Sequence, residues 1–150
     1  MRTKQIVDNE MVLMLPSHSQ NEHLARCAVS AFIAQADPTL EELADLRTVV
    51  SEAVTNCIVH GYRGTVGTVY IRVKLLAGRR VMLSVRDEGV GILDVEQAMQ
   101  PLYTGDPGGE RGGMGFTIME SFTDRLHVHS RPGRGTTVTM YKQLGEHTEV

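Results

Sequence analysis

Cysteine is scarce in this sequence, in which only Cys27 and Cys57 occur among 150 residues. Two thiols provide no disulfide framework of the kind that holds small secreted domains together. Both cysteines fall within helical patterns, so we expect two buried thiols. A chain of this kind fits a reducing compartment, and we expect the protein to be cytoplasmic.

Long apolar runs and blocks of a single charge are also missing. The apolar run near the N-terminus covers only residues 11–15, which is too short for a convincing signal peptide or a membrane span. The 15 Lys and Arg residues against 18 Asp and Glu residues give a formal charge of −3 without a basic block, so nucleic acid is not expected as a direct partner. With no internal repeat or low-complexity linker, the composition indicates one domain over residues 1–150.

Helical patterns dominate the first part of the chain. A possible edge strand at residues 11–16 precedes a helix over residues 21–36, which ends before a proline. Thr39 and Glu42 then have the spacing of a capping box, in which each side chain satisfies a backbone amide of the other residue. This box predicts the start of a long helix that continues to about Gly61.

Strand patterns follow the long helix. Residues 68–76 alternate between apolar and polar side chains, and the run from Val81 to Asp87 does the same, which predicts an antiparallel pair. Asp87 has the parity of the apolar residues in its strand, so the strand directs a carboxylate toward the buried face.

The C-terminal part is predicted to add a loop, a helix and a hairpin. Residues 98–113 lose periodicity and collect glycine and proline, as in a mobile loop. A short helix over 114–123 and strands over 125–130 and 136–142 complete the chain. The predicted fold class is α+β, a two-layer sandwich with helices on one face of a mixed or antiparallel sheet.

Polar side chains border the apolar stripe of the long helix. Glu52, Asn56 and His60 are spaced four apart. Asn56 would offer a neutral oxygen to Mg²⁺ beside a triphosphate, and Glu52 would orient or deprotonate the hydroxyl that attacks the γ-phosphate. His60 is assigned a structural role, in capping carbonyls or in packing. The alternative for Glu52 and Asn56 is a solvated polar face.

Asp87, Gly89 and Gly91 form a DxGxG turn directly after a strand. The glycines let the backbone turn sharply and approach a ligand closely. An ionised carboxylate accepts hydrogen bonds and does not donate them, so Asp87 would select an exocyclic amine such as that of adenine. The alternative is a tight turn in which Asp87 caps the next segment.

A second glycine-rich motif, residues 112–116, stands just before the short helix. Exposed amides and the positive end of a helix dipole suit phosphate oxygens. The alternative is a plain loop with a glycine-assisted helix start. Arg111, just before this motif, would pair with phosphate charge or remain solvated.

The order of these motifs, with Gly135 and Thr136 opening the last strand, resembles the gyrase, Hsp90, histidine-kinase and MutL (GHKL) ATPase superfamily over about residues 10–142. The resemblance implies the Bergerat ATP-binding fold with ATP or ADP and Mg²⁺ as cofactors. It assigns Asn56 to Mg²⁺, Asp87 to the adenine and Thr136 to the adenine side of the pocket. The matched glycine positions are Gly89, Gly91, Gly113 and Gly115.

Within that superfamily, the runs 49–62 and 111–122 resemble the bacterial anti-sigma factor serine kinases, most closely the sporulation type. This resemblance implies a homodimer that binds and inhibits a sporulation sigma factor. With ATP it would phosphorylate, and so inactivate, an anti-anti-sigma protein on a serine. Glu52 matches the proposed catalytic base and Arg111 the arginine of the nucleotide lid. Arg26 matches a position that contacts protein partners, although a solvated helix arginine is an equal alternative.

Three other functions remain open at this point. The protein would be a stress-response switch kinase if its partner surfaces differ, because the ATP site does not separate the two types. It would be a sigma-binding module if nucleotide only shapes a surface. A sensor histidine kinase would need a helical hairpin with an acceptor histidine, for which one sandwich leaves no room, and His127 and His129 fall on a predicted strand.

Overall fold

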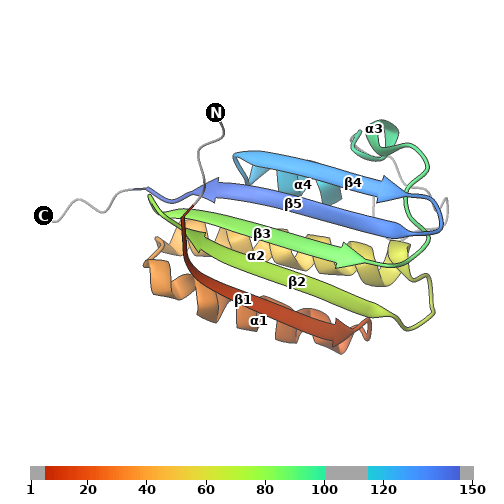
Figure 1. Cartoon of the computed structure of the whole chain (residues 1–150), viewed down its shortest axis with the longest axis horizontal. Helices are drawn as coiled ribbons and strands as arrows, with labels where there is room; N and C mark the ends of the chain where they lie inside the picture. Colours follow the sequence, from red (N-terminus) through yellow and green to blue (C-terminus); the bar gives the residue numbers. More distant parts are fainter. Residues whose placement is uncertain (1–5, 101–114, 146–150) are drawn as a thin grey trace, which may run out of the picture.

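The computed structural model describes residues 6–100 and 115–145 (Figure 1). The first half of the chain contains β1 (Val7–Pro16), α1 (Gln20–Ile33), the 3₁₀ turn η1 (Ala34–Ala36), α2 (Leu40–Thr55) and the π-helical segment η2 (Asn56–Gly61). The second half contains β2 (Thr68–Leu76), β3 (Arg80–Asp87), α3 (Val95–Ala98), α4 (Gly115–Ser121), β4 (Arg125–Arg131) and β5 (Gly135–Gln143). This order confirms the predicted α+β class.

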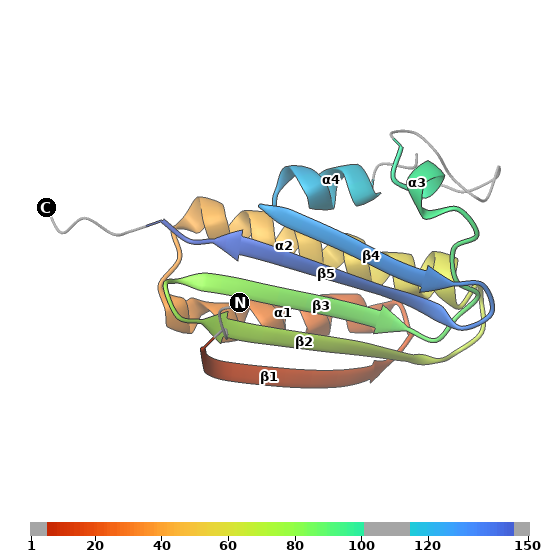
Figure 2. The same ribbon diagram turned by 45° about the horizontal axis from the view of Figure 1, so that its top comes forward.

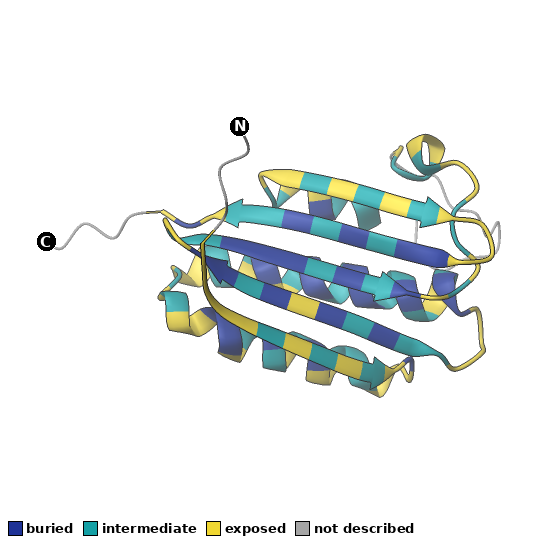
Figure 3. Ribbon diagram, in the orientation of Figure 1, coloured by how far each residue is buried: buried dark blue, intermediate teal, exposed yellow. Residues whose placement is uncertain are grey.

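The five strands form one antiparallel sheet in the order β1-β2-β3-β5-β4. Helices α1, α2 and α4 lie against one face of this sheet (Figures 1 and 2). Within the described part of the chain, no helix covers the opposite face. Buried and more exposed residues alternate along β2 and β5 (Figure 3), as expected for strands with one covered face.

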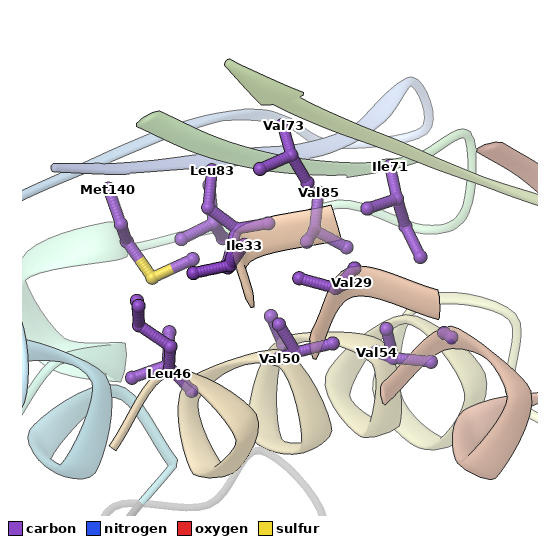
Figure 4. Packing of buried hydrophobic residues seen from close by; sticks show 14 of the residues in the cluster. Val29, Ile33, Leu46, Val50, Val54, Ile71, Val73, Leu83, Val85 and Met140 are labelled. Carbon is purple, nitrogen blue, oxygen red and sulfur yellow. The ribbon is translucent and has the colours of Figure 1, made fainter. Parts of the chain in front are cut away.

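The core lies between the helices and the covered face of the sheet (Figure 4). Val50 and Val54 project from α2 toward Val85 of β3, and Val29 projects from α1 into the same layer. Since α2 runs along the middle of the sheet, its buried stripe fixes the direction of its other faces. The polar side chains that border this stripe are thereby held at the edge of the core.

One cysteine departs from the prediction of two buried thiols. Cys57 is buried, but Cys27 is exposed on α1. The buried stripe of α1 includes Ala25 and Val29, and a residue two positions after Ala25 lies about 200° around an α-helix. Cys27 therefore points away from the core.

The long helix extends to Gly61 as predicted, but its last turn is π-helical and not α-helical. The Tyr62 N–H donates to the carbonyl of Cys57, five residues earlier, at 2.9 Å. A π-turn is wider than an α-turn and is frequent at functional sites. Here it ends with the Gly61 carbonyl accepting a hydrogen bond from the Val90 N–H at 2.9 Å, next to the DxGxG turn.

The capping box at the start of α2 is confirmed. The Thr39 N–H donates to Glu42 Oε1 at 2.9 Å, and the Glu42 N–H donates to Thr39 Oγ1 at 3.1 Å. Glu42 also accepts a hydrogen bond at Oε2 from the Gly145 N–H at 2.8 Å. The same carboxylate thus joins the beginning of α2 to the segment after β5.

We expect Thr39→Ala to lower the free energy of unfolding by about 1 kcal/mol, because one amide at the start of α2 loses its acceptor. Thr48→Ala is a matched control, since the Thr48 hydroxyl bonds to the Ala44 carbonyl within the same helix and supports no helix end. The control should change stability by no more than about 0.5 kcal/mol. Urea denaturation measures both variants, and equal effects would show that the capping box does not contribute separately.

Candidate functional site

A cavity of about 440 Å³ lies between the C-terminal end of the long helix and the sheet. Its volume is within the usual range for sites that bind small molecules. The described residues that line it come from α2, η2, β3, the turn after β3, α3, α4 and β5, and they include Glu52, Asn56, Cys57, His60, Gly61, Arg63, Asp87, Gly91, Asp94, Gln97, Gly115 and Thr136. Motifs that lie far apart in the sequence therefore meet in one place.

Asp87 is the buried acidic group of this cavity, with 5% of its surface exposed. It continues the buried parity of β3, as the alternation predicted. Its Oδ1 accepts a hydrogen bond from the Gly89 N–H at 2.9 Å. Burial raises the pKa of Asp87 above its ordinary value, and the Gly89 amide, the Cys57 side chain and the Thr136 backbone act in the opposite direction.

Three glycines make room for this carboxylate and the backbone around it. A Cβ atom at Gly61 would lie 2.8 Å from the Asp87 Cγ, and one at Gly89 would lie 2.1 Å from the Gly61 carbonyl oxygen. Gly135 has a φ of +112°, and a Cβ atom there would lie 2.1 Å from the Asp87 carbonyl oxygen. A side chain at Gly89 or Gly135 would force backbone segments apart, and one at Gly61 would displace the Asp87 carboxylate.

The β4–β5 hairpin fixes the turn that follows Asp87. The Ile92 N–H donates to Ser130 Oγ at 2.7 Å, and the hydroxyls of Ser130 and Thr136 lie 2.8 Å apart. The Gly133 N–H donates to the Val90 carbonyl at 2.7 Å. Thr136 thus belongs to the wall beside Asp87, where sequence analysis predicted it, and Ser130 connects it to the turn.

Glu52, Asn56 and Gly115 meet at another part of the cavity. A Cβ atom at Gly115, the first residue of α4, would lie 3.3 Å from both Asn56 amide atoms and 3.3 Å from Glu52 Oε2. The structure therefore brings together the predicted Mg²⁺ ligand, the predicted base and one glycine of the second motif. His60, to which sequence analysis gave a structural role, lines the cavity as well.

The remaining predicted site residues are Arg111, Gly113 and Arg26. Arg111 and Gly113 lie outside the described residues. Arg26 lies on α1, where its Nη2 is 2.8 Å from His23 Nδ1 and its Nε is 3.7 Å from Glu22 Oε1. It is not among the described residues that line the cavity.

Sequence reasoning missed several residues of the site. Ser130 has the same parity as Leu126 and Val128 on β4, and this parity could have placed it on the covered face. Helix α3 was also missed, although Asp94 caps it by accepting from the Gln97 N–H at 3.1 Å. The Asp94-x-x-Gln97 spacing is itself a helix-start signal.

The described side chains do not form a metal site by themselves. No group of three or more His, Cys, Asp or Glu residues that could hold an ion occurs within 6–100 and 115–145. A metal at this cavity would need most of its oxygen ligands from water and from a bound phosphate, which is the usual situation of Mg²⁺.

Among the residues that the structure describes, no helix is long and apolar enough to cross a membrane.

We expect the melting temperature of the wild-type protein to fall relative to that of Asp87→Asn as the pH rises, in the absence of nucleotide. Burial raises the pKa of Asp87 in the folded protein above its ordinary value. The unfolded chain therefore releases this proton at lower pH than the folded one, and wild-type stability falls as the pH rises through this window. Below the ordinary carboxyl pKa both states are protonated, so the difference between wild type and variant should become independent of pH there. Thermal unfolding from about pH 3 to pH 8 measures it, and a difference that does not change with pH over the whole range would contradict this account.

The sequence comparisons agree with the geometry of the cavity. The histidine kinase-like ATPase domain family matches residues 15–142. The anti-sigma F factor of Thermoanaerobacter sp. (strain X514) is 53% identical over 137 residues, which cover 91% of this chain and 95% of that protein. The anti-sigma F factor of Halalkalibacterium halodurans is 56% identical over 137 residues, with 91% and 93% covered.

Solved structures share the fold at low identity. The RsbU and RsbW domains of a Mycobacterium tuberculosis protein superimpose with a TM-score of 0.65 and 17% identity, over 91% of this chain and 32% of that one. The blue-light activated histidine kinase of Erythrobacter litoralis gives a TM-score of 0.57 and 20% identity, over 79% of this chain and 40% of that one. This chain thus spans less than half of either solved chain. The family match over residues 15–142 and the relatives that are more than 50% identical show that this chain belongs to the anti-sigma F factors, within the histidine kinase-like ATPase domain family.

Proposed function

We propose that this protein binds and inhibits a sporulation sigma factor and, as an ATP-dependent serine kinase, phosphorylates an anti-anti-sigma protein. The main support for kinase activity is that Glu52, Asn56 and Asp87 line one cavity. The names of relatives more than half identical to this chain support the sigma-binding half. A sigma factor acts in the cytoplasm, so the protein would work there.

Adenine recognition is assigned to Asp87. Its carboxylate lines the cavity and is held by hydrogen bonds from the protein, so its orientation is fixed before a ligand arrives. An ionised carboxylate accepts from the adenine amine and repels a carbonyl at the same place. Thr136 would support the adenine side of the pocket, as the superfamily resemblance implied, and Gly91 would let the backbone approach the ligand closely.

The phosphates and Mg²⁺ would lie near Asn56 and Gly115. The Asn56 amide is a neutral oxygen donor of the kind that Mg²⁺ accepts, and Gly115 leaves the space beside it open. Bound Mg²⁺ would neutralise phosphate charge that develops during transfer. Arg111 and Gly113 are proposed to act on the phosphates from the segment between α3 and α4.

Glu52 is the proposed catalytic base. It lies one helical turn before Asn56, and both face the same position at the start of α4. In the proposed reaction, Glu52 accepts the proton of the substrate serine hydroxyl. The serine oxygen forms a bond to the γ-phosphorus, and the bond to the bridging oxygen breaks to release ADP.

The partner surfaces are proposals that rest on the sequence. Arg26 would contact the sigma factor or the anti-anti-sigma protein from α1, outside the cavity, and the protein would act as a homodimer. A stress-response type of switch would use the same cavity with other partners. Measuring binding to the sporulation and stress sigma factors of the same organism would separate these two types.

A binding module without catalysis is the second candidate, since a nucleotide site alone does not require transfer. The position of Glu52 beside Asn56 favours the kinase. A histidine kinase is less well supported, because His127 and His129 lie on strand β4 with exposed side chains and not on a helical hairpin. Phosphohistidine on this chain after incubation with ATP would revive that alternative.

We expect Glu52→Gln to reduce transfer of labelled γ-phosphate to the anti-anti-sigma protein by about 10²- to 10⁴-fold, the usual contribution of a general base. Calorimetric binding of Mg-ATP should remain, because the amide keeps the shape of the side chain. Glu41→Gln, at an exposed position in the first turn of α2, is the matched control and should transfer normally. Unchanged transfer in Glu52→Gln would rule out Glu52 as the base, and no transfer in any form of the protein would leave the binding module as the better reading.

A further inference from the structure

Tyr62 is a buried polar residue that the proposed reaction does not use. It follows η2 directly, has 7% of its surface exposed and is not among the described residues that line the cavity. Its hydroxyl donates to the Thr68 carbonyl at the start of β2 and accepts from the Glu88 N–H at 2.8 Å. A phenol has one hydrogen to donate, so a lone pair of the Tyr62 oxygen binds the Glu88 amide.

The segment at the end of η2 holds the turn after β3 at two points. The Glu88 N–H donates to Tyr62 Oη, and the Val90 N–H donates to the last carbonyl of η2 at 2.9 Å. The amide between them, that of Gly89, donates to Asp87 Oδ1 at 2.9 Å. Three successive amides of the DxGxG turn thus have three separate acceptors. The direction of the middle bond, and with it that of the carboxylate, depends on where the two neighbouring amides are held.

The position of the Tyr62 hydroxyl is fixed by the sheet and by packing. Thr68, whose carbonyl accepts the phenol hydrogen, opposes Pro16 in the antiparallel pairing of β1 and β2. A Cβ atom at Gly67 would lie 2.1 Å from Cε1 of the Tyr62 ring, so a glycine is needed where the chain passes the ring. The ring therefore has little freedom to move, and its hydroxyl is a fixed acceptor for the turn.

We propose that Tyr62 is a positioning residue for recognition of the base: its hydroxyl holds the Glu88 amide and thereby keeps the Asp87 carboxylate directed at the amino group of adenine. This inference rests on the proposed ATP binding. Glu52 and Asn56 precede Tyr62 by more than one helical turn. Loss of the hydroxyl should therefore weaken recognition of the base and leave the transfer step unchanged.

Tyr62→Phe removes the hydroxyl and keeps the ring. Calorimetric dissociation constants for Mg-ATP and Mg-ITP, the inosine nucleotide, are the test, because inosine has a carbonyl oxygen where adenosine has the amine. A directed carboxylate accepts from the amine and repels the carbonyl, whereas a carboxylate on a loosened turn can rotate away from it. The Kd for ATP should rise about three- to tenfold, the effect of one ordinary hydrogen bond. The Kd for ITP should change less, and the rate of phosphate transfer at saturating ATP should stay the same.

Control variants separate positioning from a general loss of stability. Thr65→Val removes a hydroxyl that donates to the Tyr62 carbonyl, so it loosens the same segment without removing the acceptor of the Glu88 amide. Tyr141→Phe removes a phenol hydroxyl on β5, from a ring that stacks with an arginine of β3. Both should keep the wild-type ratio of the ITP constant to the ATP constant. Gly67→Ala displaces the Tyr62 ring and should lower this ratio, as Tyr62→Phe does.

The outcomes distinguish positioning from packing. An unchanged ratio in Tyr62→Phe, with a melting curve that shows a folded protein, overturns the inference and leaves the ATP site intact. The same fall of the ratio in Thr65→Val, at an equal loss of melting temperature, also overturns it, because general loosening would then explain the effect. If Tyr62→Phe does not fold, Gly67→Ala decides by the same criterion. A wild-type protein that binds neither nucleotide refutes the proposed function itself.

Discussion

The burial of one carboxylate constrains most of the surroundings of the cavity. A charged group at the end of β3 loses its water, and it remains ionised only if donors replace that water. The Gly89 amide is one such donor, and the Cys57 side chain and the Thr136 backbone also act to lower the pKa of Asp87. Next to this carboxylate, η2 forms a π-turn, and Gly61 leaves room for the carboxylate because it has no side chain. Close approaches of the backbone at Gly61, Gly89 and Gly135 thus shape the part of the cavity around Asp87.

The other end of the cavity is built from side chains. Glu52 and Asn56 project from α2, which packs its Val50 and Val54 stripe into the core. Because one helix provides both the stripe and the polar pair, the direction of the pair is fixed by packing against the sheet. The proposed base and Mg²⁺ ligand thus lie on a rigid element, which suits a reaction that depends on positioning.

The sequence predicted those parts of the site that follow from regular periodicity. Strand alternation placed Asp87 on the buried face, and the i, i+4 spacing placed Glu52 and Asn56 together. The capping box gave the start of α2, because it is a local pattern of two residues. The DxGxG turn was predicted to approach a ligand, but its sequence does not indicate which segment of the chain it packs against.

The missed features depend on contacts between distant segments. At the end of the π-turn, Gly61 contacts both Asp87 and the turn after β3, and helical periodicity does not predict contacts with such distant segments. Ser130 matters only because the hairpin lies against Ile92. Cys27 was expected to be buried from its helical surroundings alone, whereas its position around α1 decides its exposure.

The glycines around Asp87 have a consequence for inhibitors of this protein. At Gly89 and Gly135, the atoms that a new side chain would meet are main-chain atoms 2.1 Å away, and these cannot be moved by a compensating change of rotamer. A compound that occupies this corner would face a surface whose shape mutation cannot easily alter. Resistance to it would arise more readily where the lining consists of side chains, as at Glu52 and Asn56.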